Sequence, residues 1–247
     1  MKTVDKAFKV LDQFSYTKQE IGLSEIARMS GVDKAATRRL LVALIKHNFI
    51  EQSQETKRYR LGHGFLRLAR IREATVPVTH IAKDMVNRLV EQTNETVHVS
   101  IPGLQGMTTI AHKLPNRGRV VNIVPAQILN YHATASGLVF LAFATKATAD
   151  RILALKREKF TPTTITAKAE LQRMALQFRA QGFSQTHNSF EDDVASIAMP
   201  FFSEPGDPTG SIAIALPAAE MTAERCEVLI PVLKDAVSEI QQALTGL

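Results

Sequence analysis

Several signatures of common protein classes are missing from this sequence. It holds a single cysteine, Cys226, which excludes an intramolecular disulfide and any multi-cysteine zinc site. No run approaches the roughly 18 consecutive apolar residues of a membrane span. The first residues, MKTVDKAFKVLDQF, mix charges into their apolar positions, unlike a signal peptide. We therefore expect a cytoplasmic protein with no membrane association.

Enzyme and nucleotide-binding motifs are missing as well. The sequence has no G-x-G-x-x-G, P-loop, H-E-x-x-H or G-x-S-x-G pattern. Its seven histidines are spread along the chain. His98 and His112 fall on expected neighbouring strands and could approach each other, joined by His132 or His187, but no ligand spacing supports a metal site. We expect no catalytic residue, no metal and no cofactor.

Positive charge is concentrated at one end of the chain. Residues 1–73 hold 15 Lys and Arg against eight Asp and Glu, whereas residues 74–247 hold 15 against 16. All of the net charge of +6 therefore lies in the first segment. This asymmetry indicates a polyanionic partner for that segment, because phosphate neutralisation supplies most non-specific DNA affinity.

The most informative stretch of that segment is DKAATRRLLVALIKH, from Asp33 to His47. Asp33 is a suitable helix N-cap, because its carboxylate can accept from free backbone N–H groups. Helical spacing separates a cationic face from an apolar face. The outer face is expected to carry Lys34, Ala35, Arg38, Arg39, Val42 and Lys46, and the inner face Ala36, Leu40, Leu41, Ala43 and Leu44.

A shorter apolar-periodic piece, residues 23–30, precedes this helix across a turn that contains Gly31. Helix, short turn and longer cationic helix form the helix-turn-helix pattern, whose second helix lies in the DNA major groove. The alternative is a solvated cationic face on an ordinary helix. A hairpin follows at 49–61, where Arg58 and Arg60 alternate with apolar residues and could straddle a phosphate backbone.

The remainder of the chain indicates a second domain of the α+β type. A helix over 63–73 ends where Pro77 disfavours helix, and we place the domain boundary there. Strands are expected at 96–101, 107–114, 119–124, 195–202 and 211–216. Helices are expected at 79–92, 147–158, 167–181 and 223–244, with Pro231 kinking or breaking the last one.

One segment of the second domain is suited to anion binding. HATASG, His132–Gly137, opens an apolar helix with small residues. The first N–H groups of such a helix are uncovered and lie at the positive end of its dipole, which can hold a carboxylate. Close packing of the helix start against a sheet explains the small residues equally well.

These segments together resemble the IclR family of bacterial transcriptional regulators. The resemblance rests on GLSEIARMSGVDKAATRRLLVAL, RYRLG, ETVHVSI, LNYHATASGLVFLAF, QGFSQTHNSFEDDVASIAMPFF and GSIAIALP, all in the family's order. It implies a winged helix-turn-helix domain (residues 1–62), a linker helix used in dimerisation (63–77) and a GAF-like effector-binding domain with an antiparallel sheet (78–247). It also implies a homodimer or dimer of dimers that binds a double-stranded operator.

The resemblance assigns residues to two sites. Contacts with DNA fall on Lys34, Thr37, Arg38, Arg39, Arg58 and Arg60. Thr37 is the weakest of these, because helical spacing places it near the buried side. The effector pocket falls on a helix start, the loop 186–188 and the last two strands, with the residues Ala135, Ser136, Gly137, Thr186, His187, Asn188, Ser196, Ala213 and Ala215.

This chain departs from the family pattern within the pocket. Thr186, His187 and Asn188 stand where relatives commonly have acidic residues, and Ala213 and Ala215 stand where relatives can have serine. We expect a less acidic, more apolar pocket and an effector that is an aromatic or otherwise apolar-bodied carboxylate. Two alternatives remain: a second domain that only oligomerises, and an enzyme for a small acid using His98, His112 or Cys226.

Overall fold

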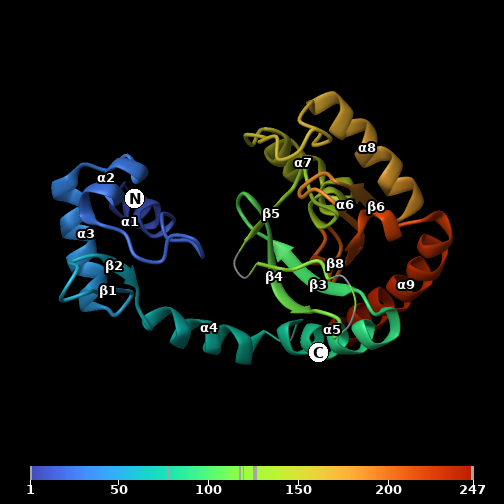
Figure 1. The fold of residues 1–247 in the computed structure, drawn as a ribbon, viewed down its shortest axis with the longest axis horizontal. Helices are drawn as coiled ribbons and strands as arrows, with labels where there is room; N and C mark the ends of the chain where they lie inside the picture. The colour runs from blue at the N-terminus through green and yellow to red at the C-terminus, as the bar shows by residue number, and fades with distance from the viewer. Residues whose placement is uncertain (1, 77, 117, 119, 125–126, 246–247) are drawn as a thin grey trace. The chain divides into compact units, whose positions relative to one another are not determined.

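The computed structural model describes residues 2–76, 78–116, 118, 120–124 and 127–245. The chain folds into two compact units, Met1–Val76 and Pro77–Leu247. The ends of the expected linker and of the expected second domain, at residues 77 and 247, lie outside the described residues, as does the first residue of the expected strand 119–124. Figure 1 shows both units and labels most of their elements.

The first unit contains four helices and a two-stranded hairpin within its described residues. In chain order the elements are α1 Lys2–Leu11, α2 Leu23–Ser30, α3 Lys34–Lys46, β1 Ile50–Gln52, β2 Tyr59–Leu61 and α4 Gly64–Thr75. A small core of α1, α2, α3 and the hairpin holds them together, built on Val10, Ile21, Ile26, Leu41, Ile50 and Tyr59. This arrangement confirms the predicted helix-turn-helix and wing.

The predicted start of α3 is confirmed in detail. The Asp33 carboxylate accepts a hydrogen bond from the Ala36 N–H at 2.8 Å, which satisfies one donor of the first helical turn. Gly31 ends α2 with a left-handed backbone at φ 66°, a conformation that glycine adopts without a Cβ penalty. The predicted inner face is wrong at one position, because Ala43 is exposed.

The second unit is built on a six-stranded sheet. Its strands are β3 Thr96–Pro102, β4 Gly106–Lys113, β5 Ile128–Asn130, β6 Ser184–His187, β7 Val194–Phe201 and β8 Gly210–Pro217. Their order is β5-β4-β3-β8-β7-β6, and every pair is antiparallel, which confirms the predicted antiparallel sheet.

Helices cover both faces of this sheet (Figure 1). α5 Val78–Thr93 and α9 Ala223–Thr245 pack on one face, and α6 Ala135–Phe143 packs on the other. α8 Lys168–Gln181 lies outside α6, and α7 Lys146–Leu153 also packs against it. α6 is therefore enclosed, and its residues from Ala135 to Ala142 are all buried.

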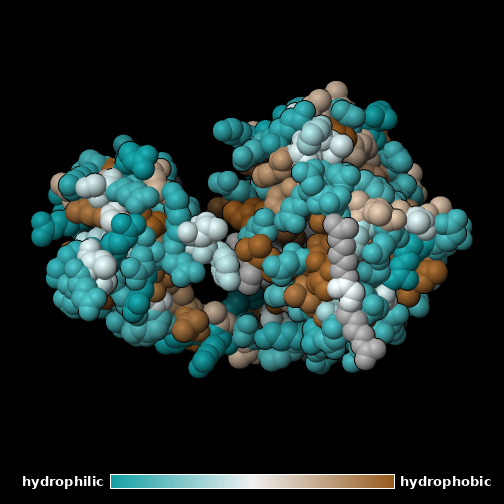
Figure 2. Space-filling model, in the orientation of Figure 1, coloured by the Kyte–Doolittle hydropathy of each residue, from teal (hydrophilic) through white to brown (hydrophobic). Residues whose placement is uncertain are grey.

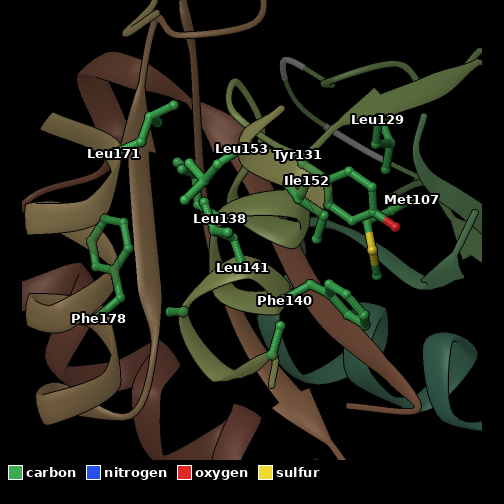
Figure 3. Packing of buried hydrophobic residues seen from close by; sticks show 12 residues of the cluster. Met107, Leu129, Tyr131, Leu138, Phe140, Leu141, Ile152, Leu153, Leu171 and Phe178 are labelled. Carbon is green, nitrogen blue, oxygen red and sulfur yellow. The ribbon is translucent and has the colours of Figure 1, made fainter. Parts of the chain in front are cut away.

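The apolar residues around α6 form a large core cluster (Figure 3). Tyr131 and Phe140 pack ring to ring at 5.5 Å, and Leu171 and Phe178 of α8 close the outer side. On the face that Figure 2 shows, hydrophilic residues cover most of both units and hydrophobic residues emerge in separate patches.

Three expectations for the second unit are wrong. The described residues of 119–124 are not a strand; the strand that pairs with β4 on its outer side is β5, which meets Gly106–Thr108. The segment 186–188 was expected as a loop, but Thr186 and His187 belong to the edge strand β6. Of the two effects expected of Pro231, the break is wrong, since α9 continues through it to Thr245.

Candidate functional site

The outer face of α3 presents positive charge to solvent. Lys34, Arg38, Arg39 and Lys46 are all exposed. Within the part of the chain that the structure describes, none of the four forms an ion pair with a carboxylate. Val42 lies between them on the same face and is 59% exposed. The face thus combines free cations with an apolar side chain, as a surface that meets DNA phosphates and base edges does.

Thr37 does not belong to this face. Its side chain is completely buried, and its hydroxyl donates to the carbonyls of Asp33 at 3.0 Å and Val32 at 3.2 Å. The side chain therefore has no surface to offer to a base or phosphate. Its hydroxyl instead connects the residues that precede α3 to the first turn of that helix. Thr37 is therefore not among the proposed DNA contacts.

The two wing arginines differ from those of α3, because both are already paired. The Arg60 guanidinium contacts the Glu51 carboxylate at 2.9 Å, and His63 Nδ1 lies 3.3 Å from the same carboxylate. These two partners hold the pKa of Glu51 below its usual value. Arg60 nevertheless remains 57% exposed, so a phosphate can compete with Glu51 for it.

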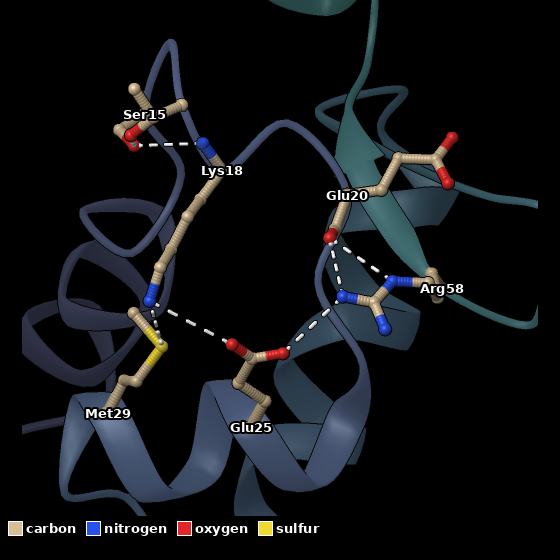
Figure 4. Close-up of polar contacts among 7 residues, drawn as sticks. Ser15, Lys18, Glu20, Glu25, Met29 and Arg58 are labelled. Carbon is tan, nitrogen blue, oxygen red and sulfur yellow. Dashed lines mark hydrogen bonds and ion pairs between the residues drawn. The ribbon is translucent and has the colours of Figure 1, made fainter.

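Arg58 connects the wing to α2 (Figure 4). Its Nη2 and Nε atoms donate to the Glu20 carbonyl at 2.8 and 3.2 Å, and Nη2 lies 3.4 Å from the Glu25 carboxylate. Lys18 approaches Glu25 from the other side at 3.9 Å. Three acceptor contacts orient the guanidinium within the protein, so its first role is to position the wing beside the helix-turn-helix.

In the second unit, a cross-strand row of small and hydroxylated side chains forms the floor of a pocket. Thr186 of β6 pairs with Ser196 of β7, and Ser196 pairs with Ala215 of β8. The next row contains Ala198 and Ala213, and it is covered by α6. Because α6 starts over that second row, the first row is left open to a ligand.

The pocket is bounded by α6 and by two irregular segments. It encloses about 570 Å³, its open mouth included. Thr134, Ala135 and Ser136 form one wall. The remaining walls come from residues 121–123, from the approach to β5 and from the β6–β7 loop, with the lining side chains Val121, Asn122, Ile123, Gln127, Leu129, Ser189, Phe190, Glu191 and Val194.

The start of α6 retains free hydrogen-bond donors. Thr134 is its N-cap, and the Thr134 hydroxyl accepts from the Gly137 N–H at 3.1 Å. Among the described residues no acceptor meets the N–H groups of Ala135 and Ser136, which line the pocket. Ser184 Oγ donates to the Ala135 carbonyl at 2.7 Å and fixes the helix start on β6. These two N–H groups and the helix dipole favour a bound anion.

His98 is a pocket residue that the sequence did not assign to the effector site. Its Nε2 lies 3.2 Å from the Ser136 hydroxyl, and its Nδ1 is buried with no hydrogen-bond partner in the described part of the chain. Burial lowers the pKa of His98 to about 4, with a further contribution from His112 on the neighbouring strand. His98 is therefore neutral at physiological pH.

Glu191 brings a carboxyl group into the pocket. It is partly buried, and burial raises its pKa, while a hydrogen bond from Gln127 acts in the opposite direction. Gln127 precedes β5 at one edge of the sheet, whereas Glu191 follows β6 at the other edge. Gln127 and Glu191 thus reach the pocket from opposite edges of the sheet. Nothing in the sequence spacing around Glu191 indicated this position.

Five of the nine residues assigned to the effector site line the pocket: Ala135, Ser136, Thr186, Ser196 and Ala215. The other four lie outside its wall. Gly137 is glycine because a Cβ there would lie 2.4 Å from Tyr131 Cα, and Ala213 packs under α6. His187 is exposed beside Gln185, and the Asn188 carbonyl accepts from the Thr163 hydroxyl at 2.6 Å.

The residues of the enzyme alternative are not brought together. His98 and His112 are direct cross-strand partners, as predicted, but His112 is exposed and is not a pocket residue. Cys226 is on α9, and its Sγ lies 3.5 Å from the Sδ of Met221, which precedes that helix. Among the described residues, no three His, Cys, Asp or Glu side chains are grouped in a way that could hold a metal ion. No helix within the described ranges is long and apolar enough to cross a membrane.

A helix-turn-helix unit with an unpaired cationic helix, followed by a unit with a pocket, defines a DNA-binding protein with a ligand-binding domain. Comparison with known proteins agrees. The model of the IclR helix-turn-helix domain matches residues 3–54, and that of the bacterial transcriptional regulator IclR C-terminal domain matches residues 74–242. The chain belongs to the IclR family of bacterial transcriptional regulators, with a helix-turn-helix DNA-binding domain and an effector-binding C-terminal domain.

Individual relatives cover nearly the whole chain. The HTH-type transcriptional regulator XynR of Escherichia coli is 27% identical over 208 residues, 82% of this chain and 81% of that protein. A crystal structure of an ICLR transcriptional regulator from Silicibacter sp. TM1040 is 34% identical with a TM-score of 0.92, covering 99% and 97% of the two chains. An IclR homolog of Microbacterium hydrocarbonoxydans, crystallised with 4-hydroxybenzoate, is 18% identical with a TM-score of 0.81, covering 99% and 100%.

Proposed function

We propose that this chain is a cytoplasmic regulator, not an enzyme, that binds a palindromic operator through α3 and senses a small organic acid in the pocket at the start of α6. The proposal is carried by one observation: Ala135 and Ser136, whose N–H groups meet no acceptor among the described residues, line a pocket in the same chain that presents unpaired cations on α3. Two separate binding surfaces of different chemistry are what a ligand-controlled DNA-binding protein requires.

For the DNA contacts, we assign Lys34, Arg38 and Arg39 to the operator. They are exposed near the N-terminal end of α3, the end that contacts base edges in helix-turn-helix proteins. Arg60 is assigned to a phosphate, in exchange with Glu51. Arg58 is assigned chiefly to positioning the wing, because its guanidinium is held by Glu20 and Glu25.

We further propose that the regulator is a homodimer or a dimer of dimers. Apolar side chains stand exposed on two helices of the DNA-binding unit, Val4 and Phe8 on α1 and Leu66, Leu68 and Ile71 on α4. A second copy of the chain would cover these side chains and supply the second α3 that a palindromic operator needs. Light scattering of the purified chain should therefore give at least twice the monomer mass of 27.3 kDa.

For the effector, we propose an aromatic or otherwise apolar-bodied carboxylate. Its carboxylate would accept from the N–H groups of Ala135 and Ser136, and its body would lie against Leu129, Val194 and Phe190. The homolog of Microbacterium hydrocarbonoxydans crystallised with 4-hydroxybenzoate shows that this fold accommodates an aromatic acid. The effector would act by binding the DNA-competent and DNA-incompetent arrangements unequally.

Two measurements test the proposal. Selection from a random DNA pool with the purified full-length chain should enrich a palindromic sequence, and a melting-temperature screen of small carboxylic acids, followed by titration calorimetry, should identify ligands. Failure to enrich any sequence would contradict the operator assignment. Binding of only glyoxylate- or pyruvate-sized compounds would contradict the apolar-bodied effector, and the absence of any acid-induced stabilisation would favour a second domain that only oligomerises.

A further inference from the structure

Val42 is an apolar residue at the centre of the cationic face of α3. With about 100° of rotation per residue, it lies roughly 40° from Arg38 on one side and roughly 60° from Arg39 on the other, and Lys46 follows one turn later. Its side chain is 59% exposed and takes no part in the core cluster that the described residues of the first unit form. Folding of the unit therefore does not account for valine at this position.

Helix formation does not account for this valine either. A β-branched side chain loses χ1 freedom in a helix, so valine is a poorer helix former than the alanine, arginine and lysine on the rest of the exposed side of α3. Single exposed valines are common on protein surfaces, but this one lies in the middle of the surface assigned to DNA. A residue that departs from local preference without a gain in packing indicates a functional position.

The chemistry of the valine side chain restricts what it can contact in a DNA complex. The guanidinium groups of Arg38 and Arg39 can reach phosphates or the hydrogen-bonding atoms of guanine. The side chain of Val42 is short and has no hydrogen-bonding atom, so it gains only from an apolar group. The major groove of unmodified DNA presents one such group, the C5-methyl of thymine.

We propose that Val42 reads a thymine methyl group in each half of the operator. This inference rests on the proposed function, and it adds a specificity-determining residue and the base that this residue selects. One helical turn, about 5.4 Å along the helix, separates Val42 from Arg38, while successive base pairs are about 3.4 Å apart. The thymine therefore lies within about two base pairs of the position that Arg38 contacts.

Deoxyuridine substitution tests this contact, because it removes the methyl group of thymine and leaves every hydrogen-bonding atom of the base in place. Each thymine of the selected operator is replaced in turn, symmetrically in both half-sites, and the Kd of the full-length chain is measured by fluorescence anisotropy. Burial of one methyl group is worth about a fourfold change in Kd. We therefore expect one position at which the paired replacement weakens binding about fifteenfold.

The Val42→Ala variant identifies the residue that reads the methyl group. It should bind the thymine operator about fivefold or more weakly than the parent chain, and deoxyuridine at the same position should then change its Kd less than about twofold. Its slope of log K against log salt concentration should stay parental, because valine carries no charge, and its melting temperature should not fall. Val228→Ala, which truncates a valine of similar exposure on α9, is the matched control and should keep the full sensitivity to the methyl group.

The outcomes separate this inference from the proposed function. If the half-sites of the selected operator hold no thymine, if no deoxyuridine replacement weakens binding, or if the sensitivity survives Val42→Ala, the thymine inference is overturned while operator binding through α3 stands. If the chain selects no operator at all, the proposed function is overturned and this inference with it.

Discussion

Replacing Arg38 and Arg39 together with alanine removes two exposed positive charges from the outer face of α3. Neither arginine is paired with a carboxylate in the described part of the chain, so the change breaks no internal ion pair. Arginine and alanine are both good helix formers, and the side chains do not contribute to the core of the unit. The variant should therefore fold normally and differ from the parent chain in its contact with DNA.

The size of the effect follows from counterion release. Each phosphate neutralised by a cation contributes about 0.9 to the slope of log K against log salt concentration. A homodimer presents four such arginines, so the double variant should lower the slope by about 3.6 if all four meet phosphates. Raising the salt concentration from 50 to 200 mM should therefore weaken DNA binding by the parent chain roughly 150-fold more than DNA binding by the variant.

The assay is fluorescence anisotropy with the selected operator at several salt concentrations. Arg173 and Lys146 are exposed on the second unit, and their double alanine variant is the charge-matched control, which should keep the parental slope. Effector affinity should be unchanged in both variants. A parental slope in the Arg38/Arg39 variant would refute the assignment of α3 as the DNA-contacting helix.

Three further predictions concern stability. Asp33→Ala removes the N-cap of α3 and should cost about 1 kcal/mol, lowering the melting temperature of the first unit by roughly 4–8 °C in calorimetry, with Asp33→Ser restoring most of it. Gly137→Ala forces a Cβ to within 2.4 Å of Tyr131 Cα and should destabilise the second unit by about 1–3 kcal/mol in urea unfolding; an unchanged midpoint would contradict the close packing of α6. His98 has a pKa of about 4 when folded against 6.5 when unfolded, so its stabilisation is complete above pH 6.5 and is lost as the pH falls towards 4, by up to about 3 kcal/mol. The raised pKa values of Glu95 and Glu191 increase stability as the pH falls and so oppose the effect of His98. The His98→Leu variant is therefore the reference, and its free energy of unfolding should fall less between these pH values than that of the parent chain.

The first unit could be predicted closely from sequence because its signals are local. The N-cap at Asp33, the turn at Gly31 and the 3.6-residue period of α3 each depend on neighbours within a few positions. What sequence could not give is the pairing of the wing arginines. Arg58 meets Glu20 and Glu25, which are more than 30 residues away, and no local pattern records that contact.

The second unit shows the limit of periodicity. The segment 119–124 is rich in β-branched residues, which predict a strand, yet its described residues join no sheet, and the strand beside β4 is β5. The short polar strand β6 carries no alternating apolar pattern, so the sequence gives no signal for a strand there. Element type is least secure where tertiary pairing decides it.

The pocket illustrates the same point. Residues whose role is set by the helix start, such as Ala135 and Ser136, were identified from sequence and line the pocket. His98 and Glu191 were not assigned to it, because they arrive from a central strand and a distant loop. The family resemblance assigned Ala213 to the pocket, but its register position places it under α6. Register and helix placement are consequences of packing.

The most direct test of the account is a linkage measurement with the two ligands together. The Kd for the selected operator is measured with and without a saturating acid, and the Kd for that acid is measured with and without operator. If the pocket controls α3, both ratios must differ from one and must be equal, since coupling between two binding sites is reciprocal. An acid that binds the pocket tightly and leaves operator affinity unchanged would contradict the account.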